Sequence, residues 1–250
     1  MPFTSYRSIT TVRGEGDVGR RTTPSPILTM WKRVRGFDGG AHCGDVIVTR
    51  RIADGRIGVV VADVAGRGPA CTSVGTRVAE RLLSLLELGF SPRFALEIVD
   101  AGVRRELEAD DETIFIASFV AIVDIVRHAF VYASAGHETA LLVRGDGTHR
   151  HLSTNGPAIG ILSEPNFGEE TVAFRPGESL VVVTDGVTDS RPNANSAFFG
   201  SAGVLASVLR SLRSGANAAY FLVNDAVRHA RGWHADDASA LVATLGRRSG

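Results

Sequence analysis

Four aspartates stand beside predicted strands and glycine turns, far apart in the chain: Asp45, Asp63, Asp185 and Asp236. Asp63 and Asp185 each end a run rich in valine, the kind of run that forms a buried strand. Hard divalent cations prefer oxygen ligands such as carboxylates, and burying a carboxylate without a partner is costly. The four residues together therefore predict one cleft that holds metal ions.

Other patterns that could carry chemistry have less support. No cluster of histidines and cysteines with the spacing of a zinc site accompanies the four aspartates. The Gly-Arg-Gly stretch at 66–68 lies between a predicted strand and a predicted helix, but the spacings of nucleotide-binding loops are absent. A catalytic triad could be drawn from Ser134, His137 and Asp185, yet no nucleophile-elbow motif supports it.

The composition narrows the class of protein. Of the 250 residues, 44% are hydrophobic and 22% are charged, which is typical of a soluble globular protein with a sizeable core. Lys and Arg total 27, as do Asp and Glu, so no basic field favours nucleic acid or an anionic membrane. No segment approaches the apolar run of about 18 residues that suggests a membrane span, and the first residues do not resemble a signal peptide. We therefore expect a cytoplasmic protein with neither nucleic acid nor membrane as partner.

The chain divides into a lead-in and one domain. Residues 1–29 include a stretch rich in Gly, Arg, Thr and Pro without periodicity, which predicts a poorly ordered or peripheral segment. Residues 30–250 contain no second linker, so we expect a single domain there. Its first strands are predicted at 44–51 and 56–63, because the Asp-Gly pair at 54–55 is a strong hairpin signal.

The remaining elements follow from hydrophobic periodicity. Helices are predicted after residue 68 as far as Gly89, and from Ser91 to about Ala109. Short turns separate the next strands, which predicts an antiparallel meander over 113–126, 129–134, 139–144 and 148–152. Two strands, two helices and a closing strand are then predicted at 170–174, 179–184, 202–212, 216–231 and 238–245. This order predicts an α+β fold, a four-layer α-β-β-α sandwich of two mainly antiparallel sheets flanked by helices.

An ordered set of motifs surrounds the aspartates. Cys-Gly-Asp at 43–45 is followed by Asp-Gly-Arg-Ile-Gly-Val-Val-Val-Ala-Asp-Val-Ala-Gly-Arg-Gly at 54–68. Ala-Gly-His, Gly-Pro-Ala-Ile-Gly, Thr-Asp-Gly-Val-Thr-Asp and Asp-Asp-Ala-Ser then follow at 135–137, 156–160, 184–189 and 236–239. This series closely resembles the bacterial stage II sporulation and sigma-regulator phosphatases, within the metal-dependent protein phosphatases of the type 2C class.

The resemblance implies roles for individual residues. Asp63 would bridge two divalent cations, Mn²⁺ or Mg²⁺, and the backbone carbonyl of Val64 would ligate one of them. Asp185 and Asp236 would bind the other cation, and Asp45 would be a further ligand or hold metal-bound water. A hydroxide bridging the two metals would then attack phosphorus, so that no protein nucleophile is required.

The resemblance also implies a substrate. It points to hydrolysis of phosphoserine or phosphothreonine, with a phosphorylated anti-sigma-factor antagonist of a bacterial partner-switching pathway as the protein substrate. Two alternatives stay open: a phosphoprotein-binding module with the same fold and little or no catalysis, and a phosphatase of small molecules.

Two further residues are candidates for substrate contacts. Arg67 could bind phosphate through its guanidinium group, although an exposed, solvated arginine is at least as common. His137 lies in a glycine turn and could act on the substrate, but a histidine that orders the turn by hydrogen bonding is the preferred interpretation.

Overall fold

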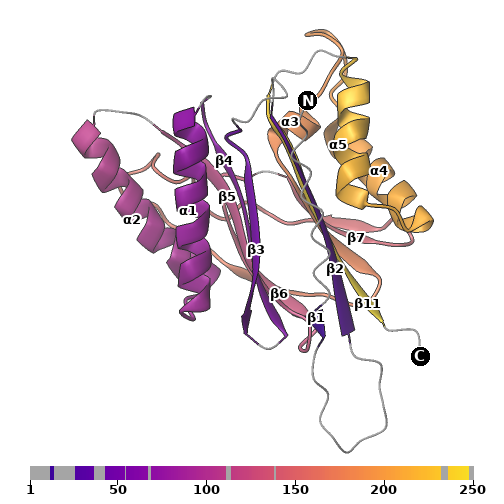
Figure 1. Cartoon of the computed structure of the whole chain (residues 1–250), viewed down its shortest axis with the longest axis horizontal. Helices are drawn as coiled ribbons and strands as arrows, with labels where there is room; N and C mark the ends of the chain where they lie inside the picture. Colours follow the sequence, from indigo (N-terminus) through magenta and orange to yellow (C-terminus); the bar gives the residue numbers. More distant parts are fainter. Residues whose placement is uncertain are drawn as a thin grey trace, which may run out of the picture.

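The computed structural model describes residues 12–13, 26–36, 43–53, 55–66, 69–110, 114–137, 139–231 and 236–247. These residues form four layers, in which helices α1 and α2, one sheet, a second sheet, and helices α4 and α5 follow one another (Figure 1). All strand pairs within the two sheets are antiparallel. The predicted α-β-β-α sandwich is therefore confirmed.

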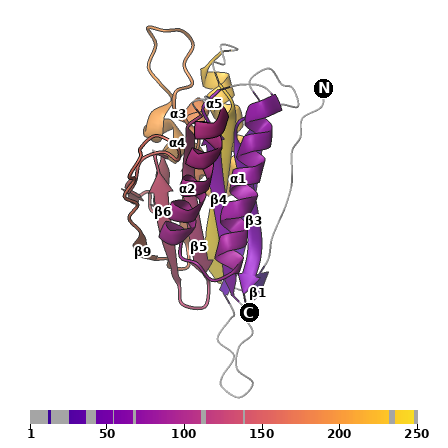
Figure 2. The same cartoon turned by 90° about the vertical axis from the view of Figure 1, so that its left-hand side faces the viewer.

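The first sheet, called the β4 sheet, contains five strands in the order β3-β4-β5-β6-β9. Their bounds are Val46–Ala53, Arg56–Val64, Ile116–Asp124, Ala129–Ala135 and Glu170–Ala173. Helices α1 (Pro69–Glu87) and α2 (Pro92–Asp110) lie across its outer face (Figure 2). Each helix begins at a proline, which is favoured in the first turn because the first amides have no partner inside the helix.

The second sheet, called the β10 sheet, has the strand order β1-β2-β11-β10-β7-β8. The strands span Val12–Arg13, Pro26–Arg35, Ala238–Arg247, Glu178–Val183, Ala140–Arg144 and His149–His151. Helices α4 (Gly200–Ser214) and α5 (Ala218–His229) cover its outer face, and the single-turn helix α3 (Asp185–Thr188) follows β10. No helix in the described ranges is long and apolar enough to cross a membrane.

Three apolar cores hold the layers together. The central core lies between the sheets and includes Phe119, Phe130 and Leu241. A second core joins the β4 sheet to α1 and α2, and a third joins the β10 sheet to α4 and α5. Strand β4 contributes alternate side chains to two of these cores and is therefore buried on both faces. This double burial explains why its sequence is a nearly continuous apolar run.

The predicted meander is wrong in one connection. Strands β5 and β6 do pair, but β7 leaves the β4 sheet and pairs with β10 and β8 in the other sheet. The chain changes sheet at Gly136, whose φ of 66° lies in the left-handed region that glycine accepts. Because β6 and β7 are both buried on two faces, their side-chain patterns do not say to which sheet each belongs.

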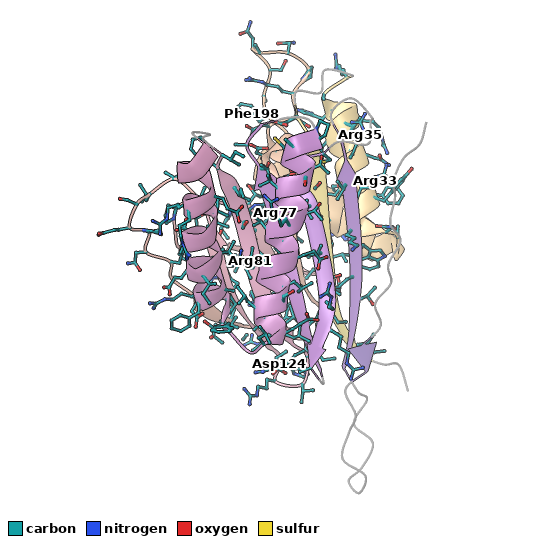
Figure 3. The ribbon with its side chains drawn as sticks, turned by 60° about the vertical axis from the view of Figure 1, so that its left-hand side comes forward. Arg33, Arg35, Arg77, Arg81, Asp124 and Phe198 are labelled. Carbon is teal, nitrogen blue, oxygen red and sulfur yellow. The ribbon has the colours of Figure 1, made fainter. Side chains whose placement is uncertain are left out.

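Strand β2 begins at Pro26, before the domain boundary expected at residue 30, and Leu28 is fully buried. Residues 12–13 and 26–29 therefore belong to the sheet, while the rest of the division into lead-in and domain stays a prediction. The strand carries charged residues on the side of α5, where Figure 3 shows Arg33 and Arg35 together. Arg33 is 5% exposed and its Cζ lies 5.2 Å from the centre of the Tyr220 ring, so its charge faces an aromatic surface.

Candidate metal centre

The four predicted aspartates meet at one end of the sandwich, between the two sheets. Asp45 directly precedes β3 and Asp63 is the penultimate residue of β4, so both come from the β4 sheet. Asp185 follows β10 and Asp236 precedes β11, so both come from the β10 sheet. This is the end that carries Phe198, opposite to Asp124 in Figure 3.

A cleft of about 400 Å³ opens at this end. Three of the four aspartates line it: Asp63, Asp185 and Asp236. The other lining residues are Val64, Ala65, Gly66, Phe115, Ala117 and Ala158. The cleft thus combines an acidic floor with small and apolar side chains, and it is large enough for a phosphorylated side chain.

Asp45 lies behind the cleft and is only 4% exposed. The hydroxyl of Thr184 donates to its Oδ2 at 2.7 Å, and the same hydroxyl accepts from the amide of Ser239 at 2.9 Å. Burial raises the pKa of the Asp45 carboxyl well above its usual range, and the nearby Asp63 raises it further. Asp45 therefore stands in a position where an added cation would stabilise its charged form.

Asp63 lies at the centre of the carboxylates. Burial raises the pKa of Asp63 to about 7, and the negative charges of Asp185, Asp236 and Asp237 add to the effect. A hydrogen bond with Asp45 acts in the opposite direction. Like charges held this close repel each other, and a divalent cation would remove that repulsion.

Asp236 and Asp237 have different positions although they are neighbours. Asp236 is exposed at the cleft, and its Oδ1 accepts from the amide of Asp237 at 2.8 Å. Asp237 is 9% exposed, and its Oδ2 accepts from the amide of Gly44 at 2.6 Å. These bonds order the turn at Asp237 and tie the start of β11 to the loop that carries Asp45.

Close backbone approaches fix the loops around the cleft. A Cβ atom on Gly44 would lie 2.9 Å from the carbonyl oxygen of Val64, and one on Gly75 would lie 3.0 Å from the carbonyl oxygen of Gly44. A Cβ atom on Gly186 would lie only 1.8 Å from the carbonyl oxygen of Asp237. Side chains at these positions would force the aspartate-bearing segments apart, so the glycines are needed where the segments meet.

The donor set fits hard divalent cations. It consists of carboxylates and the carbonyl of Val64, which is the oxygen chemistry that Mg²⁺ and Mn²⁺ prefer. Within the described ranges, no three acidic, histidine or cysteine side chains form a ready-made group around one ion. The carboxylates instead surround the cleft, and their mutual repulsion favours the neutral form of Asp63.

The structure does not bring His137 to the cleft. Its imidazole is 3% exposed and lies beside Phe119, with ring centres 6.4 Å apart. Burial lowers the pKa of His137 to about 4, so the ring is neutral at physiological pH. Its backbone carbonyl accepts hydrogen bonds from the hydroxyls of Ser134 and Thr154, at 2.7 and 2.8 Å. These hydrogen bonds hold the turn through the backbone of His137, and the role of its side chain stays a prediction.

The structure does not support a catalytic triad of Ser134, His137 and Asp185. The Ser134 hydroxyl donates to the carbonyl of His137 and not to its ring, which argues against a triad. Arg67 lies outside the described residues. Cys43 and Cys71 are free thiols, and burial raises the pKa of Cys43 well above its usual range, as do Asp45 and Asp237. A high thiol pKa is typical of an unreactive cysteine.

Three functional contacts were missed from the sequence: the Thr184 hydroxyl on Asp45, the Asp237 carboxylate on Gly44, and Phe115 in the cleft wall. The first two partners lie within motifs that were recognised, so their polar side chains next to Asp185 and Asp236 were an available signal. Phe115 lies within the strand predicted at 113–126, and nothing in the sequence of that segment indicates that its side chain faces a cleft.

The fold is that of the type 2C phosphatases. The structure superposes with a TM-score of 0.78 on the PP2C phosphatase domain of the cell-fate determinant SpoIIE from Bacillus subtilis, at 16% identity, covering 91% of this chain and 66% of that one. It also resembles the catalytic domain of the phosphatase PstP, solved with two manganese ions, with a TM-score of 0.65 at 17% identity, covering 88% and 99%.

The family follows from the sequence. The family model described as Stage II sporulation protein E (SpoIIE) matches residues 53–246, and the chain belongs to this family. It is similar to the phosphoserine phosphatase RsbU of Bacillus subtilis, with 29% identity over 136 residues, which is 54% of this chain and 40% of RsbU. The chain thus spans less than half the length of that relative.

Proposed function

We propose that this protein is a metal-dependent phosphatase of phosphoserine or phosphothreonine in proteins. The observation that carries the proposal is the meeting of Asp63, Asp185 and Asp236 in one cleft, with Asp45 behind them. Membership of the SpoIIE family and the similarity to RsbU support the same activity.

In this proposal each residue has a task. Asp63, the Val64 carbonyl, Asp185 and Asp236 would hold two divalent cations, Mn²⁺ or Mg²⁺, and Asp45 would hold the inner side of the site. When bound, such cations neutralise charge on a phosphoryl group and activate the attacking water. Thr184 keeps Asp45 oriented through its 2.7 Å hydrogen bond, and Asp237 holds the Gly44 loop beside it.

The apolar wall formed by Phe115, Ala117 and Ala158 would limit water around a bound phosphoryl group. Lower water content strengthens the interaction of the carboxylate-held charges with the substrate. The described lining of the cleft contains no serine, threonine or cysteine that could serve as a protein nucleophile, and in this proposal the aspartates hold the cations instead.

We further propose the kind of substrate and setting. A phosphorylated anti-sigma-factor antagonist, acted on in the cytoplasm, is the substrate that agrees with the similarity to RsbU. A phosphoprotein-binding module and a phosphatase of small molecules are the competing functions, and the same assay separates all three.

The test measures turnover of p-nitrophenyl phosphate and of a phosphoserine peptide by the purified chain, with Mn²⁺, with Mg²⁺ and with EDTA. We expect turnover that requires the metal and falls at least about 100-fold in Asp63→Asn and Asp185→Asn. Asp146→Asn is the matched control, because Asp146 lies in the exposed turn between β7 and β8 and does not line the cleft.

Each competing function predicts another result. Binding of the phosphopeptide without metal-dependent turnover of either substrate would indicate the binding module. Turnover of the aryl phosphate together with small phosphometabolites, and none of the peptide, would indicate the small-molecule phosphatase.

A further inference from the structure

Three large apolar side chains remain exposed beside the cleft. Phe115 is 38% exposed, Ile161 49% and Leu162 47%. We call these three residues the apolar shelf. Single exposed apolar residues are common on proteins, but a group of them next to a functional cleft marks a contact surface.

Backbone hydrogen bonds place the shelf next to the cleft. Ile116 and Ile159 form an antiparallel bridge, with N···O distances of 3.1 and 2.9 Å, so the neighbouring Phe115 lies opposite Gly160. The amide of Ile161 then donates to the carbonyl of Ala158 at 3.4 Å. Since Phe115 and Ala158 both line the cleft, the shelf continues its wall outward.

A buried carboxylate holds the shelf in place. Asp100 on α2 is fully buried, and its Oδ1 accepts from the amide of Gly160 at 2.9 Å. Its Oδ2 accepts from Nε of Arg104 at 2.8 Å, and Nη1 of Arg104 donates to the carbonyl of Ser163 at 2.7 Å. Hydrogen bonds therefore fix the loop at 160 and at 163, on both sides of Ile161 and Leu162.

The shelf is also joined to the metal-binding loop. The amide of Ala65 donates to the carbonyl of Phe115 at 2.9 Å, and Ala65 follows Val64 directly. The distance between the shelf and the carboxylates is thus set by the backbone. Such a fixed spacing suits recognition of side chains at a fixed distance from a phosphorylated residue.

We infer that the apolar shelf binds apolar side chains next to the phosphoserine or phosphothreonine of a protein substrate. The inference rests on the proposed function and adds the determinant of substrate choice. Phe115 belongs both to the cleft and to the shelf, so a chain segment whose phosphate lies at Asp63 and Asp185 has the shelf beside it. Ile161 and Leu162 are not among the residues that line the cleft, so a small phosphomonoester does not need them.

The carboxylates cannot supply this selectivity themselves. They act on the phosphoryl group, which is the same in every phosphoserine, and so they do not distinguish flanking residues. Burial of an apolar side chain against the shelf would add binding energy that a polar side chain lacks. The expected partner is therefore a phosphoprotein with an apolar surface around its modified residue.

The experiment compares two phosphoserine peptides of equal length and charge. One carries leucines and phenylalanines on both sides of the phosphoserine, and the other carries serines and glutamines. We expect kcat/KM to be about tenfold higher for the apolar peptide, mainly through KM. The double variant Ile161→Ser, Leu162→Ser should remove this preference, whereas Leu88→Ser, which also removes an exposed leucine, should keep it.

Hydrolysis of p-nitrophenyl phosphate separates this inference from the proposed function. The ratio of peptide to aryl-phosphate kcat/KM should fall in the double variant, because Ile161 and Leu162 are not among the residues that line the cleft around the aryl phosphate. Equal kcat/KM for the two peptides, or a preference that survives in the double variant, would overturn the inference and leave the phosphatase proposal intact.

A peptide-binding measurement tests the shelf even if neither peptide is hydrolysed. Fluorescence anisotropy of the two labelled peptides on the native chain and on the double variant reports the same preference without catalysis. A stronger affinity for the apolar peptide, lost in the double variant, supports the shelf even if the phosphatase proposal fails. Equal affinities overturn it.

Discussion

The amide of Gly44 donates a 2.6 Å hydrogen bond to the carboxylate of Asp237, across 193 positions of the chain. This bond joins the loop that carries Asp45 to the loop that carries Asp236, and so it connects the two sheets at the cleft. Because the carboxylate is buried, its removal would leave the Gly44 amide without a partner.

Replacement of Asp237 tests this bond. We expect Asp237→Ala to lower the free energy of unfolding by about 2 kcal/mol, whereas Asp237→Asn keeps an acceptor oxygen and costs less than about 1 kcal/mol. Urea unfolding in EDTA measures both. Equal destabilisation by the two substitutions would mean that the charge, and not the hydrogen bond, supports the loop.

Gly186 tests the backbone approach beside this bond. A methyl group there would overlap the carbonyl oxygen of Asp237, so we expect Gly186→Ala to cost more than about 3 kcal/mol or to prevent folding. Gly145→Ala is the control, because a Cβ atom at Gly145 meets nothing within 4 Å. Urea unfolding and the yield of folded protein give the comparison, and a Gly186→Ala protein of native stability would contradict the close approach.

Asp63 is expected to trade stability for cation binding. In EDTA at pH 8, above its raised pKa of about 7, the ionised carboxyl is repelled by its neighbours. Asp63→Asn should therefore raise the free energy of unfolding by about 1–2 kcal/mol, discounted for partial exposure. Addition of Mn²⁺ should raise the Tm of the native chain but not of the variant. Asp146→Asn should gain no stability in EDTA and should keep the response to Mn²⁺, because the Asp146 carboxylate accepts two hydrogen bonds from Thr148. An Asp63→Asn protein less stable than the native chain in EDTA would count against the repulsion.

The burial of His137 is expected to lower the stability of the fold in acid. Burial lowers the pKa of His137 to about 4 in the folded state, below the 6.5 that is usual for histidine, so the unfolded state binds the proton more tightly. The buried neutral ring therefore contributes fully to the free energy of unfolding above pH 6.5. This contribution is lost as the pH falls towards 4, by up to about 3 kcal/mol.

The comparison of variants isolates this effect from the carboxylates, whose raised pKa values act in the opposite direction. The free energy of unfolding, measured in EDTA from pH 7.5 to 4.5, should depend less steeply on pH in His137→Gln. His149→Gln, which removes an exposed histidine, is the matched control. Identical slopes in the native chain and His137→Gln would show that the buried ring does not govern this loss.

The sequence predicted those elements whose patterns are local. The valine run of β4 and the hairpin at Gly55 were correct because burial on both faces and a positive φ each leave a direct mark on residue type. The partner of β7 was not predictable in this way, because burial on two faces is the same in either sheet. Strand β2 (Pro26–Arg35) was missed altogether, because the burial of Arg33 against Tyr220 places a charged residue where an apolar one would mark a strand.

The candidate site divides along the same line. The positions of Asp63 and Asp185 at the ends of apolar strands could be predicted from neighbouring residues. The bond from Thr184 to Asp45 joins residues 139 positions apart, and it arises only when the two sheets pack. The burial of His137 likewise depends on the packing of the sheets around it, so the sequence left two interpretations open.

The change of sheet at Gly136 gives the site a mechanical property. Asp45 and Asp63 belong to one layer, and Asp185 and Asp236 belong to the other. A slide of one layer by a single residue, roughly 3.3 Å, would pull the pairs out of register with each other. In the proposed metal site, ions bound by residues of both layers would therefore hold the two layers in register, and a shift of one layer would weaken ion binding.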